Sequence, residues 1–216
     1  MPTHNGAMAP IERLKAGRPS AATTAANRQR ILRAARETFI EFGYTTATFD
    51  VIATRAGLSR PALHYHFANK SELYRDAIDR PAVDVMAAAA ATARRSKTLP
   101  AQLVSFFSTA LGADDPGQCN AQLVAAAVRE SVRNETRIVT DRSVLRMARA
   151  FISSAMREAI DRGELSDEIN IIDAVETMVA VLCGIAAYPS AVGPADNLPA
   201  IVSTFELLIT DRLLAG

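Results

Sequence analysis

The sequence is poor in the residues that build metal and redox sites. Its 216 residues include no tryptophan, three histidines and two cysteines. Cys119 and Cys183 are far apart and have no neighbouring ligand pattern, so we expect neither a metal site nor a cofactor. Buried thiols are the simpler interpretation of the two cysteines, and an accessible redox thiol is the alternative.

Strand patterns and membrane-spanning runs are also lacking. No segment alternates apolar and polar residues between hairpin turns, whereas alanine is abundant and favours helix. The most apolar stretch, 171–187, is interrupted by Asp173 and Glu176, and no secretory leader is recognisable. The sequence therefore predicts an all-α protein of the cytoplasm.

Charge is nearly balanced overall but unevenly distributed along the chain. The net charge is +1, yet residues 1–80 hold 12 lysines and arginines against 7 acidic residues, and residues 81–216 hold 12 against 16. A positive amino-terminal part is attracted to phosphate, whereas a mildly acidic remainder is not. The distribution agrees with nucleic-acid binding by the amino-terminal part, although it does not identify that function alone.

The most informative segment is residues 48–67, TFDVIATRAGLSRPALHYHF. Thr48 and Ser59 are good helix N-caps, because a side-chain oxygen can accept from the free amides of a first turn. Gly57 falls where the first of two helices must stop, and the left-handed backbone of a helix end suits glycine. This is the composition of a helix-turn-helix. We expect its apolar set to be Val51, Ile52, Ala53, Ala56, Leu58, Leu63 and Phe67.

The second helix of this segment has an unusual exposed side. It carries Arg60, His64, Tyr65 and His66, and Lys70 follows. Cationic and aromatic side chains suit phosphate oxygens and base edges. The alternative is a solvated helical hairpin within a larger bundle.

The flanks of the hairpin extend the pattern. Apolar residues at helical spacing precede it and end at Gly43 and Tyr44, and Asn69 with Glu72 forms a capping box that begins another helix. The run GYTTATFDVIATRAGLSRPALHYHFANKSELY resembles the DNA-binding domain of the TetR family of transcriptional regulators. His64 departs from the family pattern, in which many relatives have tyrosine, and Arg60 stands at a variable position.

The resemblance implies a two-domain, all-α regulator. We expect a flexible arm over residues 1–24, a three-helix DNA-binding domain over residues 25–80, and a helical bundle for ligand binding and dimerisation over residues 81–216. The first helix is expected to begin with Asn27 as its N-cap, and Pro81 is expected to kink or break the helix that begins at Asn69.

Roles in DNA binding follow from position. Thr48, Ser59 and Lys70 are expected to hold phosphates, and Tyr65 and His66 to bond the DNA backbone. The leading turn should face base edges, through Arg60, Pro61, Ala62 and His64. In the arm, Arg18 could lie in a minor groove, or the arm could be a tail with incidental charge.

The last two apolar segments, 169–187 and 198–214, carry apolar residues on more than one stripe. Such helices must be buried on more than one side. The resemblance implies that they pair with their copies in a homodimer, which binds a pseudo-palindromic operator. A fully internal hairpin is the alternative. The expected interface residues are Ile172, Val175, Val179, Leu182, Ile201, Phe205 and Leu208.

The resemblance also implies that the second domain binds a small-molecule effector, and that binding releases a repressor from its operator. Candidate wall residues are Gln102, Phe106, Phe107, Met147 and Phe151, with ordinary core packing as the alternative. An enzyme is not expected, because this domain has no histidine, no glycine-rich phosphate loop and no cysteine–histidine pair. A DNA-binding or interaction protein without any ligand is the other alternative.

Overall fold

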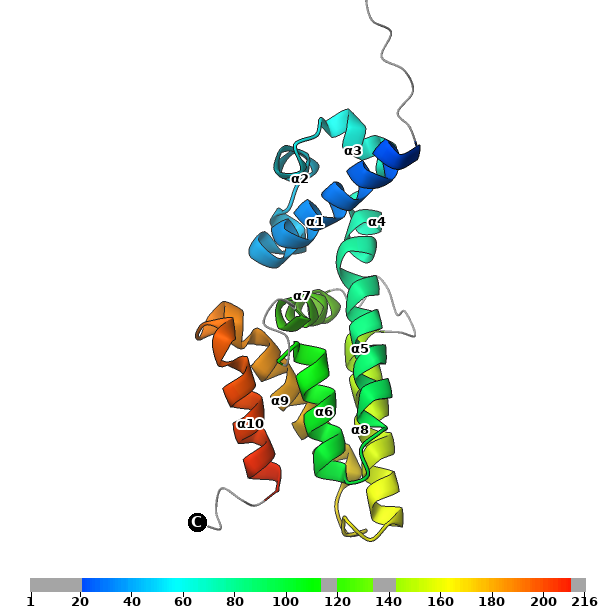
Figure 1. The fold of residues 1–216 in the computed structure, drawn as a ribbon, viewed down its shortest axis with the longest axis vertical. Coiled ribbons are helices and arrows are strands. Elements are labelled where there is room, and N and C mark those ends of the chain that lie inside the picture. The colour runs from blue at the N-terminus through cyan, green and yellow to red at the C-terminus, as the bar shows by residue number, and fades with distance from the viewer. Residues whose placement is uncertain (1–20, 114–119, 134–142, 211–216) are drawn as a thin grey trace, which may run out of the picture.

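The computed structural model describes residues 21–113, 120–133 and 143–210, and over these ranges every regular element is a helix. Helices α1 to α3 lie at one end of the molecule, and α6 and α8 to α10 at the other (Figure 1). The long rod formed by α4 and α5 joins the two ends, and α7 crosses between them. The expected all-α class and its division into a small amino-terminal domain and a larger bundle are confirmed.

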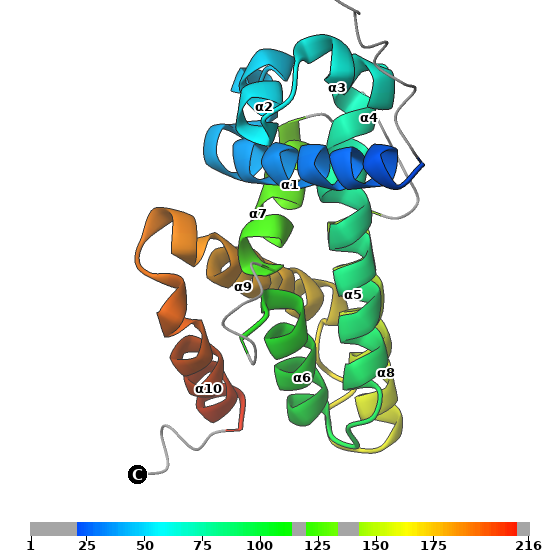
Figure 2. The same ribbon diagram turned by 45° about the horizontal axis from the view of Figure 1, so that its top comes forward.

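The amino-terminal domain packs around α1 (Ala21–Thr46). Helix α2 (Phe49–Ala56) packs on α1, α3 (Arg60–His66) packs on α2, and α4 (Lys70–Tyr74) packs on α1 and closes the group (Figure 2). Three aromatic rings contact one another at its centre: the Phe39 and Tyr44 rings lie 5.0 Å and 5.1 Å from the Tyr74 ring, both edge to face. Edge-to-face pairs stabilise a core beyond the area that they bury.

The rod contains a change of helix type. A π-helical turn, Arg75–Asp79, separates α4 from α5 (Arg80–Ala93), and the amide of Arg80 donates to the carbonyl of Arg75. Pro81 then occupies the first turn of α5, where it has no amide to donate to a carbonyl of the preceding π turn. The break that Pro81 predicts is therefore a π turn in an otherwise continuous rod.

Over the residues that the structure describes, the second domain is a bundle of five helices. They are α6 (Leu99–Leu111), α7 (Asn120–Arg133), α8 (Val144–Asp161), α9 (Ile171–Ala191) and α10 (Leu198–Ile209), with the 3-10 turn η2 (Ala195–Asn197) before α10. Helix α6 packs along α5 and α10, and α9 packs on α7 and α8. The Phe107 ring stacks on Phe205 at 4.8 Å and so fixes α10 to α6.

Two sequence expectations about the first domain are wrong. Helix α1 begins by Ala21 rather than after Asn27, because the alanine-rich segment at residues 21–26 is a good helix former with nothing to stop it. Residues 21–24, which were expected to belong to the arm, are therefore helical. The second error concerns Val51, which was expected in the apolar core but is 43% exposed, whereas Phe49 is buried.

Candidate nucleic-acid interface

The turn between α2 and α3 is fixed from two sides. Gly57 has φ 63° and ψ 38°, a left-handed conformation, and the amide of Leu58 donates to the carbonyl of Ala53 at 2.9 Å. From α1, Arg30 Nη2 donates to the carbonyl of Ala56 at 2.7 Å. A Cβ at position 57 would lie 2.8 Å from that same Nη2. Glycine is thus needed for its backbone angle, and a Cβ there would also require the Arg30 guanidinium to shift.

The two N-caps form as the sequence predicts. The Oγ1 of Thr48 accepts from the amide of Val51, and the Oγ of Ser59 accepts from the amide of Ala62, each at 3.3 Å. Both residues are exposed. Because each oxygen acts as an acceptor in its cap, each hydroxyl keeps its own proton for donation outward. That proton suits a phosphate oxygen.

Helix α3 divides into a buried and an exposed side. Leu63 and Phe67 are buried, at 0% and 1%, and anchor the helix to the core. Helix α3 lies at the end of the molecule away from the second domain (Figure 2). Tyr65 is 72% exposed. The exposed or half-exposed side chains on the exposed side include Arg60, Pro61, Ala62, His64, Tyr65 and His66. The structure thus brings the predicted base-reading and backbone residues of α3 onto one accessible surface.

An ion pair orients the first side chain of this surface. Arg60 Nη1 lies 2.9 Å from Oδ2 of Asp50, which sits in the first turn of α2. Both side chains are more than half exposed, so the pair adds little to stability. The pair nevertheless holds the guanidinium of Arg60, at the start of α3, beside the first turn of α2. The His64 ring rests on Phe49, with centroids 4.7 Å apart, and is oriented in the same way.

Lys70 is more constrained than the sequence suggests. Its ammonium donates to the carbonyls of Thr45 and Ala47, at 3.2 Å and 3.0 Å, and lies 4.6 Å from the centre of the Tyr44 ring. An ammonium has three donors, so these two bonds leave one free for a phosphate. The residue therefore joins α4 to the end of α1 in addition to its predicted role at the DNA.

We expect Lys70→Met to weaken binding to operator and random DNA equally and to reduce the slope of log K against log salt by about 0.9, since one phosphate contact is lost. The measurement is DNA affinity at several salt concentrations. Arg95→Met, at an exposed position beyond the end of α5, is the matched control. An unchanged slope with lower stability would limit Lys70 to its carbonyl contacts.

The interface domain is joined to the second domain by polar contacts at the rod. The hydroxyl of Tyr74 donates to the carbonyl of Ala126 on α7 at 3.1 Å, in a buried setting. Arg129 on the same helix reaches the carbonyl of Ile40 on α1. Burial, with help from Asp79 and Glu130, raises the pKa of Tyr74 well above its ordinary value. Tyr74 thus stays neutral and links both domains at the π turn.

Asp79, at the end of the π turn, gives the fold a pH dependence. Burial, reinforced by Glu130, raises its pKa from 3.8 to about 6, and Arg75 opposes the shift. The folded state therefore binds the proton more tightly than the unfolded state. The contribution of Asp79 to stability is greatest below pH 3.8 and is lost as the pH rises through about 6.

We expect Asp79→Asn to make the free energy of unfolding depend less on pH. After allowance for solvent screening, the substitution should raise the free energy of unfolding by about 1–2 kcal/mol more near neutral pH than at pH ~4.5. Urea unfolding at fixed protein concentration measures the effect. The exposed Asp84→Asn is the control. Equal effects of Asp79→Asn at both pH values would contradict the expectation.

The predicted dimer residues separate into two groups. Val175, Val179, Leu182 and Phe205 are buried within the single chain, at 6%, 4%, 1% and 7%, so little of each side chain is open to a second copy, and their place in a dimer contact stays a prediction. Each occupies the stripe of α9 or α10 that faces the bundle. The outward stripes carry Ile172 at 75% exposure, Leu208 at 53%, and the half-buried Ile201.

Ile201 and Leu208 of the outward stripes line an apolar groove. It has a volume of about 450 Å³ and lies between α9 and α10. Its lining residues are Val181, Ile185, Tyr188, Asn197, Ala200, Ile201, Thr204, Phe205 and Leu208. Helix α9 is also the one described helix long and apolar enough to cross a membrane, yet only 22% of its apolar window is buried. The half-buried residues of the groove and the exposed Leu207 and Leu208 thus leave an apolar surface open in the single chain.

The predicted effector wall is brought together but closely packed. Phe106 stacks on Phe151 at 4.4 Å and contacts Phe107 at 6.2 Å. Gln102 is 5% exposed and lies one turn before Phe106, and Met147 is half-buried one turn before Phe151. These five residues therefore lie around the α6–α8 packing, where they also act as core.

Other predicted features lie elsewhere or outside the described residues. Arg18 and Cys119 belong to the segments that the structure does not describe. Cys183 is half-buried, and burial raises the pKa of its thiol, which lowers its reactivity. Arg30 and Asp50 were missed by sequence reasoning, because each acts through a residue on another helix.

Known proteins share both halves of this structure to different degrees. The family description "Bacterial regulatory proteins, tetR family" matches residues 31–77. The HTH-type transcriptional activator FasR of Mycolicibacterium smegmatis is 40% identical over 85 residues. That alignment covers 37% of this chain and 38% of FasR, so the chain matches well under half of this curated relative.

Solved structures extend the similarity to the second domain at the level of fold. A TetR transcriptional regulator from Chloroflexus aurantiacus has a TM-score of 0.67 and 20% identity, covering 88% of this chain and 96% of its own. The SmeT–triclosan complex has a TM-score of 0.60 and 21% identity, covering 85% and 91%. The sequence likeness is therefore concentrated in the amino-terminal domain, whereas the fold is shared over most of the chain.

Proposed function

Because residues 31–77 belong to the DNA-binding domain of the TetR family, we propose that the chain is a transcriptional regulator that binds a pseudo-palindromic operator as a homodimer and responds to a small-molecule effector. The observation that carries the proposal is the division of α3, with Leu63 buried and Arg60 and Tyr65 exposed. A helix that is anchored to the core by one side and exposed to solvent on the other can enter a major groove. Such a regulator works in the cytoplasm, where the bacterial chromosome lies.

The roles at the DNA follow from the geometry. Arg60, Pro61, Ala62 and His64 are proposed to face base edges, with the guanidinium suited to a guanine and the Ala62 methyl to a thymine methyl. Phosphates are proposed to meet the hydroxyls of Thr48 and Ser59, the free N–H of Lys70, and the side chains of Tyr65 and His66. Arg18 in the preceding arm remains a proposed minor-groove contact.

Homodimerisation is proposed to cover the groove between α9 and α10. One recognition helix makes too few contacts for selective binding, whereas a two-fold dimer presents two helices about one helical turn apart. The uncovered apolar surface of α9 and α10 favours a second copy of the same chain as its partner. The residues proposed for the contact are those of the outward stripes, Ile172, Ile201 and Leu208.

The second domain is proposed to bind the effector within the bundle. The name of the SmeT–triclosan complex describes an aromatic ligand on a protein of this fold. An effector must favour one arrangement of the two DNA-binding domains over the other. The bonds from Tyr74 to Ala126 and from Arg129 to Ile40 join the bundle to the DNA-binding domain directly, so they are the proposed path of that coupling.

Repression is the proposed outcome of operator binding, although FasR is named an activator. The position of the operator relative to the promoter decides the sign, so a reporter fusion of the bound promoter settles it. Loss of the protein should raise expression from that promoter. A fall in expression would identify activation.

Selected-site sequencing with the purified protein tests the proposal as a whole. We expect enrichment of a two-fold symmetric sequence whose half-sites lie one or more helical turns apart. Enrichment of a single half-site would contradict the dimer, and no enrichment would contradict sequence-specific binding. Thermal shift against a metabolite library then separates an effector-responsive regulator from a protein without a ligand, since a ligand of the folded state must raise the melting temperature.

A further inference from the structure

Asp50 places a carboxylate at the surface that is proposed to meet DNA. It is the single acidic residue of the range 42–71, which also holds Arg55, Arg60 and Lys70. Its side chain is 64% exposed. A carboxylate beside a nucleic acid repels the phosphates and so lowers affinity for DNA of every sequence. An acid at this place needs a reason that affinity for DNA in general does not supply.

The carboxylate is bonded to one of the side chains that are proposed to read bases. Arg60 Nη1 donates to Asp50 Oδ2 at 2.9 Å, from the start of α3 to the first turn of α2. The residue before Asp50 acts on the same helix, since the ring of Phe49 lies 4.7 Å from the ring of His64. Two consecutive residues of α2 thus contact the two polar side chains that are proposed to face base edges.

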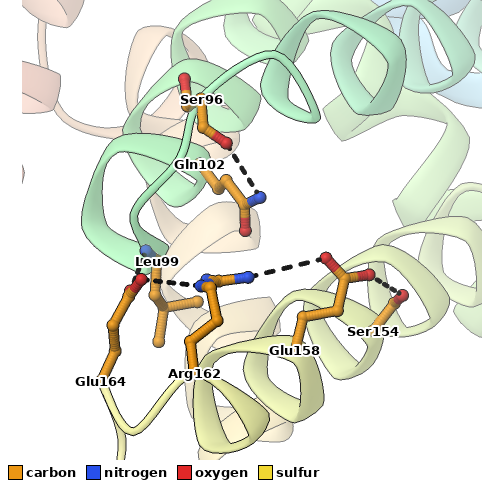
Figure 3. A network of polar contacts seen from close by, with 7 residues as sticks. All are labelled: Ser96, Leu99, Gln102, Ser154, Glu158, Arg162 and Glu164. Atoms are coloured by element: carbon orange, nitrogen blue, oxygen red, sulfur yellow. Dashed lines mark hydrogen bonds and ion pairs between the residues drawn. The ribbon is translucent and has the colours of Figure 1, made fainter.

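This ion pair differs from one that has a structural task. In the second domain, Glu164 accepts from Arg162 Nε and from the amide of Leu99, each at 2.8 Å, which joins the start of α6 to the segment that follows α8 (Figure 3). Within the part of the chain that the structure describes, the Asp50 carboxylate bonds the Arg60 guanidinium and no backbone amide. A pair of two exposed side chains adds little to stability. The effect of Asp50 on Arg60 is therefore sought at the surface rather than in the fold.

The Arg60 guanidinium can bond two kinds of acceptor on DNA. Phosphate oxygens carry charge and are the same at every base pair, whereas O6 and N7 of guanine are uncharged and mark one base. A guanidinium has five N–H donors, so one bond to Asp50 leaves others for a base edge. The negative charge of Asp50 repels a phosphate that approaches Arg60, but it does not repel an uncharged base. The pair thereby favours the acceptor that carries sequence information.

We propose that Asp50 is a positioning residue that raises sequence specificity and lowers affinity for DNA in general, because it directs Arg60 to a base edge and away from phosphate. The proposal rests on the proposed function, since it assigns a specificity determinant to the DNA interface of that regulator. When DNA covers the pair, the exclusion of water lowers the dielectric constant around both charges and strengthens their attraction. A pair that is weak in the free protein thus restrains Arg60 in the complex.

The test is Asp50→Asn, which removes the charge and keeps the size of the side chain. Affinity is measured for the operator that the wild type selects, for its single-base variants and for a random duplex of equal length. We expect the variant to bind random DNA about threefold more tightly, because one repelling charge is lost, and this gain should shrink at high salt. The ratio of operator to random affinity should fall about fivefold, with the loss confined to the base that Arg60 reads.

Three further variants separate positioning from other roles of the charge. Asp50→Glu keeps the charge, so its affinity for random DNA should equal that of the wild type. Glu41→Gln is the matched control, because Glu41 is 51% exposed and also pairs with an arginine, Arg55 Nη2, at 2.6 Å. It should leave the ratio of operator to random affinity unchanged. In the Arg60→Ala background, Asp50→Asn should cause no further loss of base preference.

A ratio that Asp50→Asn leaves unchanged, or a loss spread equally over all bases of the half-site, would overturn the proposal. A lower melting temperature with an unchanged ratio would also overturn it, since that result is expected if the carboxylate only stabilises the start of α2. A wild type that selects no operator would overturn the proposed function together with this inference. A wild type that selects an operator, with a variant that keeps the same preference, would overturn this inference alone.

Discussion

Leu208→Asp should yield a folded monomer that has lost high-affinity operator binding. Leu208 is 53% exposed on α10 and borders the groove between α9 and α10, so a carboxylate there costs the single chain little. In the dimer the same carboxylate would be buried against apolar surface, which is costly without a partner charge. Losing the second recognition helix should weaken operator binding on the order of 100-fold or more.

The control for this prediction is Val179→Asp. Val179 is 4% exposed and faces the bundle from α9, so its carboxylate would be buried even in the monomer. We expect this variant to lose its cooperative unfolding transition rather than merely to dissociate. Sedimentation and circular dichroism together separate the two results. A Leu208→Asp protein that still sediments as a dimer would place the subunit contact elsewhere.

Arg60→Ala should weaken operator binding by about 1–3 kcal/mol and relax sequence preference at one position of each half-site. Arg60 begins α3 and is 58% exposed, and its guanidinium is paired with Asp50 in the first turn of α2. Removal of a base contact changes the ratio of operator to random DNA, whereas removal of a phosphate contact does not.

The measurement is affinity for the selected operator, its single-base variants and random DNA. Arg55→Ala is the matched control, because Arg55 is bonded to Glu41 at 2.6 Å and lies over the Phe42 ring, on the α1 side of the domain. Equal losses on operator and random DNA for Arg60→Ala would assign this guanidinium to a phosphate instead.

Features that act within one turn were the ones the sequence predicted well. The caps at Thr48, Ser59 and Asn69 and the stop at Gly57 each depend on atoms within four residues. Helical spacing likewise located the apolar helices of the second domain. Arg30 could not be found in this way, since its bonds cross 26 and 27 residues to the turn.

The spacing of apolar residues in α9 and α10 could not predict which side of each helix is buried. The periodicity of α9 and α10 indicates that both stripes are apolar, but not which one faces the chain's own bundle. Val179 and Leu208 are equally apolar in sequence and opposite in burial. The packing of α9 on α7 and α8 and of α10 on α6 decides which stripe is buried.

One apolar face runs along the rod from end to end, through the π turn. Tyr74, Ile78, Ala82 and Met86 are spaced four residues apart and are all buried. Tyr74 bonds α7 at one end of this run, and Met86 lies within α5 at the other. The DNA-binding domain and the bundle therefore share one continuous apolar seam, which ties the position of one to the position of the other.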